Sequence, residues 1–383
     1  MTRHAATTLG LLMVNASLAY AQAPATCLSF KDAVNVPTGL FASGVVIEDF
    51  NNDGAVDLAV TNQNANNVSL LLGDGTGVFS RKTDFPAGGP PQRIAAADLD
   101  GDRNLDLILP ITMGNAVALL FGDGRGRFSE PKLLPVEGGP FMTVVADFNA
   151  DGRLDIAVGT NNAGSRRVAV LAGSGPRTFS APAYFGSFES TPTALGTADF
   201  NRDGTLDIAA GGGANVPPNE NNLSILLGDG KGGFGAPAYF TVGEAPQSMS
   251  IADYNGDALS DIAISNSLPM TMNSTVSLLL GDGKGRFAPR VPLEIGVLGR
   301  GTGAADFNRD GHLDLAVGNN GSNSVSVLLG DGKGHFAAKT DFAVGTNPRK
   351  IAVGDLNRDG RPDIVTPNTG SNNVSILINN CTR

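Results

Sequence analysis

The sequence contains no Trp, only three His and only two Cys, and after its N-terminal segment it has no long apolar run. Few histidines are therefore available as the base of a Ser–His or Cys–His catalytic pair. His4 lies in the leader, His312 in an acidic loop and His335 in a hairpin motif. A membrane-spanning helix needs about 20 consecutive apolar residues, which no later stretch supplies. The sequence therefore disfavours a triad enzyme and predicts no membrane span.

Basic residues are outnumbered by acidic ones. The chain has 27 Lys and Arg against 37 Asp and Glu, which gives a formal net charge of −10. Nucleic acids and anionic membranes are bound through basic surfaces, so neither is expected as the main partner. The composition favours a cation or a neutral ligand.

The first 21 residues read as a signal peptide. A positively charged start at 1–4 precedes the largely apolar stretch 5–19, and Ala19-Tyr20-Ala21 is an A-x-A cleavage pattern. We expect cleavage after Ala21 and one mature domain over 22–383. Cleavage after a second A-x-A at 21–23, or a buried N-terminal helix, are the alternatives. The protein is therefore expected to be secreted, to the exterior, the cell surface or the periplasm.

One acidic motif, D-x-[ND]-x-D-G-x-x-D, recurs seven times at intervals of about fifty residues. The glycine is displaced in the second and fifth copies. Regular repeats of this length indicate a solenoid, a propeller or an array rather than unrelated domains. The copies begin at Asp49, Asp98, Asp147, Asp199, Asp253, Asp306 and Asp355.

Each repeat contains four short runs rich in Val, Ile, Leu and Phe. In the second repeat the runs are 92–97, 107–109, 116–121 and a fourth run that ends near 136. The Gly-rich hairpin 122–128 precedes the fourth run. No stretch sustains a helical pattern for three turns. Four-stranded units of this period predict an all-β fold, a seven-bladed β-propeller. A β-solenoid has shorter repeats, and isolated fifty-residue domains would have marginal cores.

The hairpin motif occurs in six complete copies, and the seventh is divided between the chain ends. Residues 374–381 match 68–75, and residues 27–30 match 76–79. The N-terminal segment is therefore predicted to supply the missing outer strand of the last blade, from Phe30 to Val36, and to close the ring. The match puts Cys27 and Cys381 at consecutive positions, so an exported chain is expected to form a disulfide there. Two free thiols are the alternative.

The acidic loops have the composition of calcium sites. Positions 1, 3, 5 and 9 carry carboxylates or amides that can converge on one cation, with the carbonyl of position 7 as a further ligand. Hard oxygen donors suit Ca²⁺, which accepts 6–8 oxygens in flexible geometry, better than Mg²⁺. We predict up to seven Ca²⁺. The predicted ligands are Asp49, Asn51, Asp53, Asp57, Asp98, Asp100, Asp102, Asp106, Asp147, Asn149, Asp151, Asp155, Asp199, Asn201, Asp203, Asp207, Asp253, Asn255, Asp257, Asp261, Asp306, Asn308, Asp310, Asp314, Asp355, Asn357, Asp359 and Asp363.

An EF-hand and a turn without a cation are the two other interpretations of these loops. An EF-hand needs a Glu at position 12, and no copy has an acidic residue there. Asp and Asn also form turns without a cation, but several carboxylates within nine residues repel one another unless a cation binds. Calcium occupancy stays open for the second and fifth loops, where Arg103 and Ala258 stand at the turn position. It also stays open for the seventh, where Pro362 precedes the last ligand.

The acidic loops, the G-x-F hairpins and G-x-x-P turns such as 88–91 and 345–348 resemble FG-GAP (VCBS-type) repeats. The resemblance covers about residues 27–381. Such repeats build the seven-bladed propeller of integrin α-subunits and of some fungal lectins. The resemblance implies Ca²⁺ between the first and second strands of each blade, with ligands bound on the opposite face or between blades. It implies little about activity.

Most Asp residues belong to the acidic loops, which contain 22 of the 30. Few carboxylates are therefore left for another role. Nothing marks a pair of carboxylates with glycosidase spacing, and no catalytic residue is predicted. The loops between second and third strands are rich in Asn, Gly and Ser, and functional groups often lie on such loops. We expect a monomeric binding or adhesion module for an extracellular glycan or protein. A carbohydrate-active lyase or hydrolase on the same scaffold is the alternative.

Overall fold

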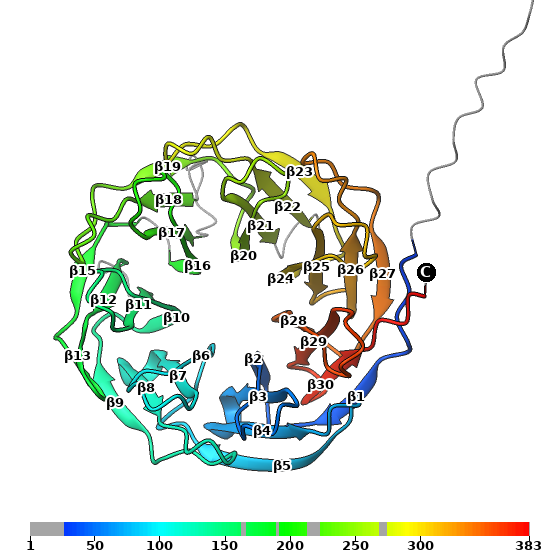
Figure 1. The fold of residues 1–383 in the computed structure, drawn as a ribbon, viewed down its shortest axis with the longest axis horizontal. Helices are drawn as coiled ribbons and strands as arrows, with labels where there is room; N and C mark the ends of the chain where they lie inside the picture. The colour runs from blue at the N-terminus through cyan, green and yellow to red at the C-terminus, as the bar shows by residue number, and fades with distance from the viewer. Residues whose placement is uncertain (1–26, 162–165, 189–190, 213–222, 268–273, 383) are drawn as a thin grey trace, which may run out of the picture.

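The computed structural model describes residues 27–161, 166–188, 191–212, 223–267 and 274–382, so the predicted signal peptide lies outside the described residues. The described chain forms seven four-stranded antiparallel sheets that stand around a central axis (Figure 1). The predicted all-β, seven-bladed β-propeller is confirmed. Within the described ranges no helix is long and apolar enough to cross a membrane.

Each blade runs from an inner strand beside the axis to an outer strand at the rim (Figure 1). Blade 1 comprises β2 (Ala42–Glu48), β3 (Asp57–Asn62), β4 (Asn67–Gly73) and β5 (Phe79–Pro86). Blade 2 comprises β6 (Ala95–Ala97), β7 (Asp106–Ile111), β8 (Ala116–Leu120) and β9 (Lys132–Pro135). Blade 3 comprises β10 (Pro140–Ala146), β11 (Asp155–Thr160), β12 (Val168–Leu171) and β15 (Ala183–Phe185), with a small hairpin of β13 (Gly173–Gly175) and β14 (Thr178–Phe179).

The other four blades repeat this order. Blade 4 comprises β16 (Pro192–Ala198), β17 (Asp207–Gly212), β18 (Leu223–Leu226) and β19 (Ala238–Phe240). Blade 5 comprises β20 (Pro246–Ala252), β21 (Asp261–Ser267), β22 (Ser274–Leu279) and β23 (Val291–Glu294). Blade 6 comprises β24 (Gly299–Ala305), β25 (Asp314–Asn319), β26 (Ser324–Leu328) and β27 (Thr340–Ala343). Blade 7 comprises β28 (Ala352–Gly354), β29 (Asp363–Asn368), β30 (Asn373–Leu377) and β1 (Val34–Pro37).

The core lies between blades rather than inside them. Seven clusters of buried apolar side chains each combine residues of two neighbouring blades. One of them packs Leu58 and Val60 of blade 1 against Val365 and Val374 of blade 7. Burial of one such side chain contributes about 1.5–3 kcal/mol, so most of a blade's stabilisation depends on its neighbours.

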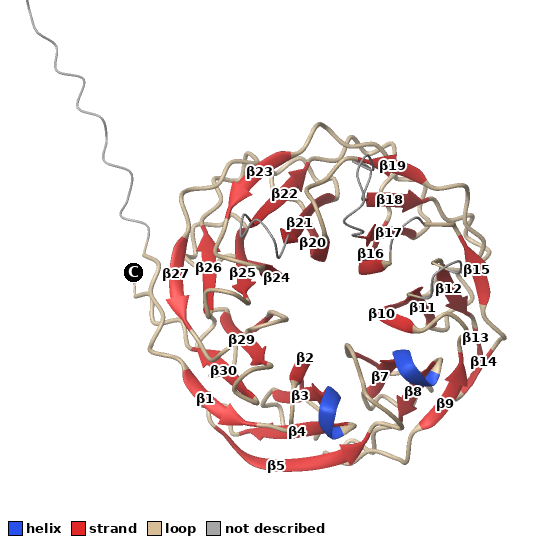
Figure 2. Cartoon of the chain, turned by 180° about the vertical axis from the view of Figure 1, so that it is seen from behind, coloured by secondary structure: helices blue, strands red, loops and turns tan. Residues whose placement is uncertain are grey.

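In blades 1, 2, 6 and 7, short connections join the second and third strands at the end of the blade opposite the acidic loops. Two of them contain 3-10 turns, η1 (Gln63–Ala65) and η2 (Thr112–Gly114), which are visible from behind in Figure 2. Asn66 and Asn115 follow these turns in the left-handed conformation, with φ of 54° and 46°. Asn tolerates this region better than most residues, which accounts for its frequency in these connections.

The ring closes as the split repeat predicts. β1 pairs antiparallel with β30, and Phe30 forms a β-bridge with Asn379 that corresponds to the Gly–Phe bridges of the other hairpins. The regular strand begins at Val34 rather than Phe30. Cys27 and Cys381 form the predicted disulfide, with their Cα atoms 5.6 Å apart. Pairing and disulfide together join the two ends of the chain at one seam.

Loss of the disulfide is predicted to destabilise the ring. The bond spans 354 residues, and the chain-entropy model gives about 5 kcal/mol for a loop of this size. We expect a double Cys27→Ser/Cys381→Ser variant to unfold at a clearly lower denaturant concentration than the oxidised protein. Reduced wild-type protein should match the variant, and reductant should not affect the variant itself. Equal midpoints for the oxidised and reduced wild type would contradict a stabilising role.

Candidate metal-binding loops

Each acidic loop joins the inner strand of a blade to the second strand, and it folds around the side chain of its first residue. In the first loop, Asp49 accepts hydrogen bonds from the backbone N–H of Asp53 at 3.2 Å and of Gly54 at 2.7 Å. Asn51 accepts a bond from the N–H of Asp53 at 2.9 Å, and Asp53 accepts one from Ala55 at 2.7 Å. These consecutive turns hold the polar side chains of positions 1, 3 and 5 in one small loop.

The displaced glycines of the second and fifth loops do not change the loop backbone. Positions 4 and 6 have positive φ in all seven loops, and each loop has one glycine at one of the two positions. In the second loop the N–H of Arg103 still donates to Asp98 at 2.8 Å, and in the fifth the N–H of Ala258 donates to Asp253 at 2.8 Å. The glycine has therefore moved from one left-handed position to the other, which preserves the turn.

The aspartate at position 9 is the best-enclosed residue of the loop. It begins the second strand of its blade, and its relative exposure is 0% in every copy. In the sixth loop, one carboxylate oxygen of Asp314 accepts a bond from the N–H of Phe307 at 2.8 Å. The other accepts one from Gly330 at 2.8 Å. The same pair of bonds occurs in all seven blades. The aspartates are Asp57, Asp106, Asp155, Asp207, Asp261, Asp314 and Asp363.

In blades 1 to 6 the backbone donor that follows the third strand and bonds this aspartate is a glycine. A β-carbon at Gly330 would lie 2.2 Å from the carbonyl oxygen of Leu313, which is too close for any side chain. The absence of a β-carbon lets the two backbones approach, and the N–H of Gly330 then reaches Asp314. The first Gly of each G-D-G hairpin is therefore required for packing.

Burial raises the pKa of these aspartates. Desolvation is the largest cause and neighbouring aspartates add to it, whereas the two backbone hydrogen bonds act in the opposite direction. The pKa rises to about 7 for Asp314 and to about 6 for Asp57, Asp106 and Asp363. A nearby cation would favour the ionised form, so the electrostatics of the loop suit a bound metal ion.

The second loop brings three carboxylates closest together. Oxygens of Asp98, Asp100 and Asp106 all lie within 4.8 Å of one another, and this is the only such acidic group among the described residues. Arg177 of blade 3 reaches this loop and pairs with Asp100 at 2.5 Å, while its guanidinium carbon lies 4.5 Å from the ring centre of Phe121. The chain thus supplies one positive charge to its most acidic loop, a contact that the repeat pattern did not predict.

The hairpin of each following blade covers the preceding loop. Phe128 of blade 2 packs edge-to-face on Phe50 of the first loop at 5.7 Å, and the N–H of Gly126 donates to the carbonyl of Phe50 at 3.1 Å. Blade 7 has no intact hairpin, because its hairpin is where the chain begins and ends. Phe30 supplies the ring at this seam and packs on Phe307 at 5.8 Å.

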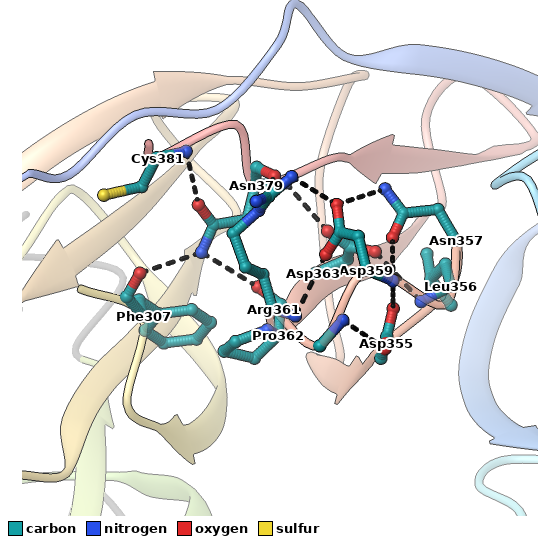
Figure 3. Close-up of polar contacts among 11 residues, drawn as sticks. Phe307, Asp355, Leu356, Asn357, Asp359, Arg361, Pro362, Asp363, Asn379 and Cys381 are labelled. Atoms are coloured by element: carbon teal, nitrogen blue, oxygen red, sulfur yellow. Dashed lines mark hydrogen bonds and ion pairs between the residues drawn. The ribbon is translucent and has the colours of Figure 1, made fainter. Parts of the chain in front are cut away.

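Asn379 supplies the hydrogen bond that is missing at the seam. Its side-chain amide donates to the carbonyl of Phe307 at 2.8 Å (Figure 3). The equivalent carbonyls of the first, fourth and fifth loops accept a bond from a hairpin glycine of the next blade. The backbone N–H of Asn379 donates to Asp363 at 2.8 Å, and its side-chain oxygen accepts a bond from the N–H of Cys381 at 3.0 Å. One residue therefore joins the last loop, the preceding blade and the disulfide. The repeat alignment placed Asn379 at a glycine position but gave it no role.

The residues present fit a calcium ion. The donors are all oxygens, the loop turns are shared by all seven copies, and carboxylate oxygens in the second loop converge to within 4.8 Å. A carboxylate oxygen that accepts one hydrogen bond keeps a second lone pair, so the buried aspartate can still bind a cation. Six to eight oxygen ligands in adaptable geometry are typical of Ca²⁺.

Replacement of a buried position-9 aspartate is predicted to destabilise the blade. Asp314→Asn leaves one oxygen acceptor for two backbone donors, and an unsatisfied buried donor costs about 1–3 kcal/mol. Chemical unfolding in calcium-containing buffer measures this loss. Asp123→Asn is the matched control, because an Asn keeps the oxygen that accepts the N–H of Arg125 in an exposed hairpin. Equal unfolding midpoints for the two variants would argue against the proposed role of Asp314.

Comparison with protein families supports the repeat assignment. A family model described as the FG-GAP-like repeat matches residues 49–109, 147–210 and 306–366. These segments contain the first, second, third, fourth, sixth and seventh acidic loops. A search of curated proteins found no match.

Several solved structures share the fold. BBS1N in complex with ARL6DN has a TM-score of 0.63 at 14% identity, over 92% of this chain and 98% of that chain. The V. cholerae biofilm matrix protein Bap1 has a TM-score of 0.52 at 13% identity, over 92% and 91%. A catalytically inactive virginiamycin B lyase from Staphylococcus aureus with quinupristin has a TM-score of 0.58 at 15% identity, over 91% and 99%.

Identities this low show a common fold and carry no activity from one protein to another. The fold, the loop motif and the family model agree with one another. Three FG-GAP-like repeats within a closed ring of seven blades identify the chain as an FG-GAP-type β-propeller.

Proposed function

We propose that the protein is an exported, calcium-stabilised module, acting as a monomer, that binds an extracellular glycan or protein. An FG-GAP-type propeller is a scaffold for binding or adhesion. The observation that carries the proposal is the regular placement of seven acidic loops at one end of the blades. At the other end, four-residue connections join the second and third strands of blades 1, 2, 6 and 7, and the corresponding sequence segments of blades 3, 4 and 5 are longer. One end is uniform and suits metal ions, and the other varies as a recognition surface does.

Calcium is proposed for a physical reason. Each loop combines a fully buried aspartate with further carboxylates and an amide or a fourth carboxylate, and burial makes an ionised carboxylate costly. When bound, Ca²⁺ would supply the positive charge that these groups lack. Positions 1, 3, 5 and 9 would hold the ion in each loop, with Asp49, Asn51, Asp53 and Asp57 in the first.

Export is proposed from the N-terminal sequence and the disulfide. The leader pattern at 1–21 precedes a chain whose only two cysteines are joined to each other. Disulfides of this kind persist in oxidising compartments and are rare where thiols are kept reduced. These two observations are independent, and both favour a periplasmic, cell-surface or extracellular location.

Calcium removal is predicted to destabilise the protein. The metal content of the purified mature chain, measured by atomic emission after dialysis, should be about seven Ca²⁺ if each loop holds one ion. EDTA should lower the thermal midpoint, and added Ca²⁺ but not Mg²⁺ should restore it. A midpoint that EDTA leaves unchanged would refute calcium stabilisation.

A single-loop variant refines this test. Asp53→Ala removes a position-5 carboxylate without disturbing a buried strand, so it should remove one Ca²⁺ per chain. Asp331→Ala, in an exposed hairpin, is the matched control and should keep the full content. Loss of the same amount of metal from both variants would show that the counted ions do not lie in the loops.

The ligand class is tested by two assays run side by side. A glycan array and an assay of polysaccharide degradation, each with Ca²⁺ and with EDTA, separate binding from turnover. Saturable binding without product formation, lost in EDTA, is the expected result. Multiple turnovers without stoichiometric binding would contradict the proposed binding function. They would favour the alternative, a carbohydrate-active lyase or hydrolase. Neither assay depends on the location of the binding surface.

A further inference from the structure

Four basic residues gather around the propeller axis, away from the calcium loops. They lie at the start of three inner strands, at the end of the blades opposite the acidic loops. We call them the axial cation cluster: Arg93, Arg300, Arg349 and Lys350.

Strand register places these residues at the starts of three inner strands. The first paired residue of the inner strand is Pro91 in blade 2, Gly299 in blade 6 and Pro348 in blade 7. The four basic residues follow these positions by one or two residues. Arg300 and Arg349 stand one residue after the bridge position, and Arg93 and Lys350 stand two residues after it. Because the inner strands surround the axis (Figure 1), the starts of these three strands lie around the same end of the axis. Blades that are far apart along the chain thus contribute charge to one place.

The contacts of Arg93 show that it lies among the blades and not at the outer surface. It is 7% exposed, and its guanidinium donates to the carbonyl of Ser43 in blade 1 at 3.3 Å. Its guanidinium carbon also lies 5.9 Å from the ring centre of Phe141 in blade 3. The side chain therefore contacts the blades on both sides of its own.

Arg300 and Arg349 contact neutral groups. Arg300 donates to the side-chain oxygen of Gln247 at 2.6 Å, and its Nε is buried without a hydrogen-bond partner in the described structure. Arg349 lies 5.3 Å from the ring centre of Phe41. Among the ion pairs of the described residues, none joins a carboxylate to any member of the cluster.

The four charges also act on one another. Burial, followed by the charges of Arg349 and Arg300, lowers the pKa of Arg93 to about 9. Burial, followed by the charge of Arg93, lowers the pKa of Lys350 to about 8. Like charges held together in a partly desolvated region repel one another, and a bound anion would relieve this repulsion. The chain as a whole has a formal net charge of −10, so this local excess of cations is opposite in sign to the charge of the chain.

We propose that the axial cation cluster binds a small polyvalent oxyanion that carries two or more carboxylate or sulfate groups. Arg presents a planar fork of donors to such oxygens, and Lys adds a mobile charge. One carboxylate or sulfate can engage the arginines of blades 6 and 7, and a second can engage Arg93 and Lys350. This site is separate from the calcium loops, and it does not depend on the glycan or protein ligand proposed above.

The test uses the calcium-saturated mature protein and isothermal titration at low ionic strength. The probes are sucrose octasulfate for sulfate groups and trigalacturonate for carboxylates, with sucrose and maltotriose as uncharged controls. We expect binding of at least one charged probe and of neither control. Binding of only one charged probe identifies the oxyanion, and binding of both assigns the shared chemistry. Binding of neither would overturn the proposal.

Paired variants locate the site. The double variant Arg349→Gln/Lys350→Gln removes two charges from the cluster, and Lys284→Gln/Lys333→Gln removes two from exposed hairpins. We expect the first to weaken binding by about tenfold or more, and the second by less than about twofold. Without the anion, the first variant should be no less stable to heat than the wild type, because it relieves repulsion. Equal losses of affinity in both variants would show that binding is nonspecific attraction and would refute the site.

Discussion

The fold depends on a buried carboxylate that accepts two backbone hydrogen bonds. In each blade the position-9 aspartate joins the start of the acidic loop to the end of the third strand, through bonds of 2.8 to 3.1 Å. The bond to the loop fixes the turn that presents the polar side chains. The bond to the residue after the third strand, a glycine in blades 1 to 6 and Asn379 in blade 7, fixes the segment that covers the neighbouring blade. Loop, strand and hairpin are thus held by one side chain, which also stands among the predicted metal ligands.

This arrangement couples metal binding to the assembly of the ring. Without a cation, burial raises the pKa of Asp314 to about 7, and the ionised form is disfavoured. With a cation, the charge is compensated where the strand begins. The hairpin above the loop, with Phe128 on Phe50 in the first case, adds an apolar cover that belongs to the next blade. A metal ion in one loop would therefore stabilise two blades.

The sequence predicted much of this because the motif repeats. Blade number, strand order, the seam and the disulfide all follow from aligning repeats, and all four are confirmed. The motif alone marks only position 6 as left-handed, so the second and fifth loops depart from it in sequence. The structure shows position 4 to be equivalent in this respect, so Gly101 and Gly256 serve the same turn. The contacts of Arg177, Asn379 and Arg93 depend on which blades become neighbours. The sequence of one repeat therefore does not predict them.

The seam sets the order in which the molecule can be completed. β1 is synthesised early, and its partner β30 comes last; Asn35 and Ser375, hydrogen-bonded at 2.6 Å, are 340 residues apart. Until then β1 has unpaired backbone groups, and the first blade has no neighbour on one side. Non-local pairing of this kind is slow to form. A chain shortened at its C-terminus loses the partner of its first strand, and its arc of blades exposes an apolar face at each end.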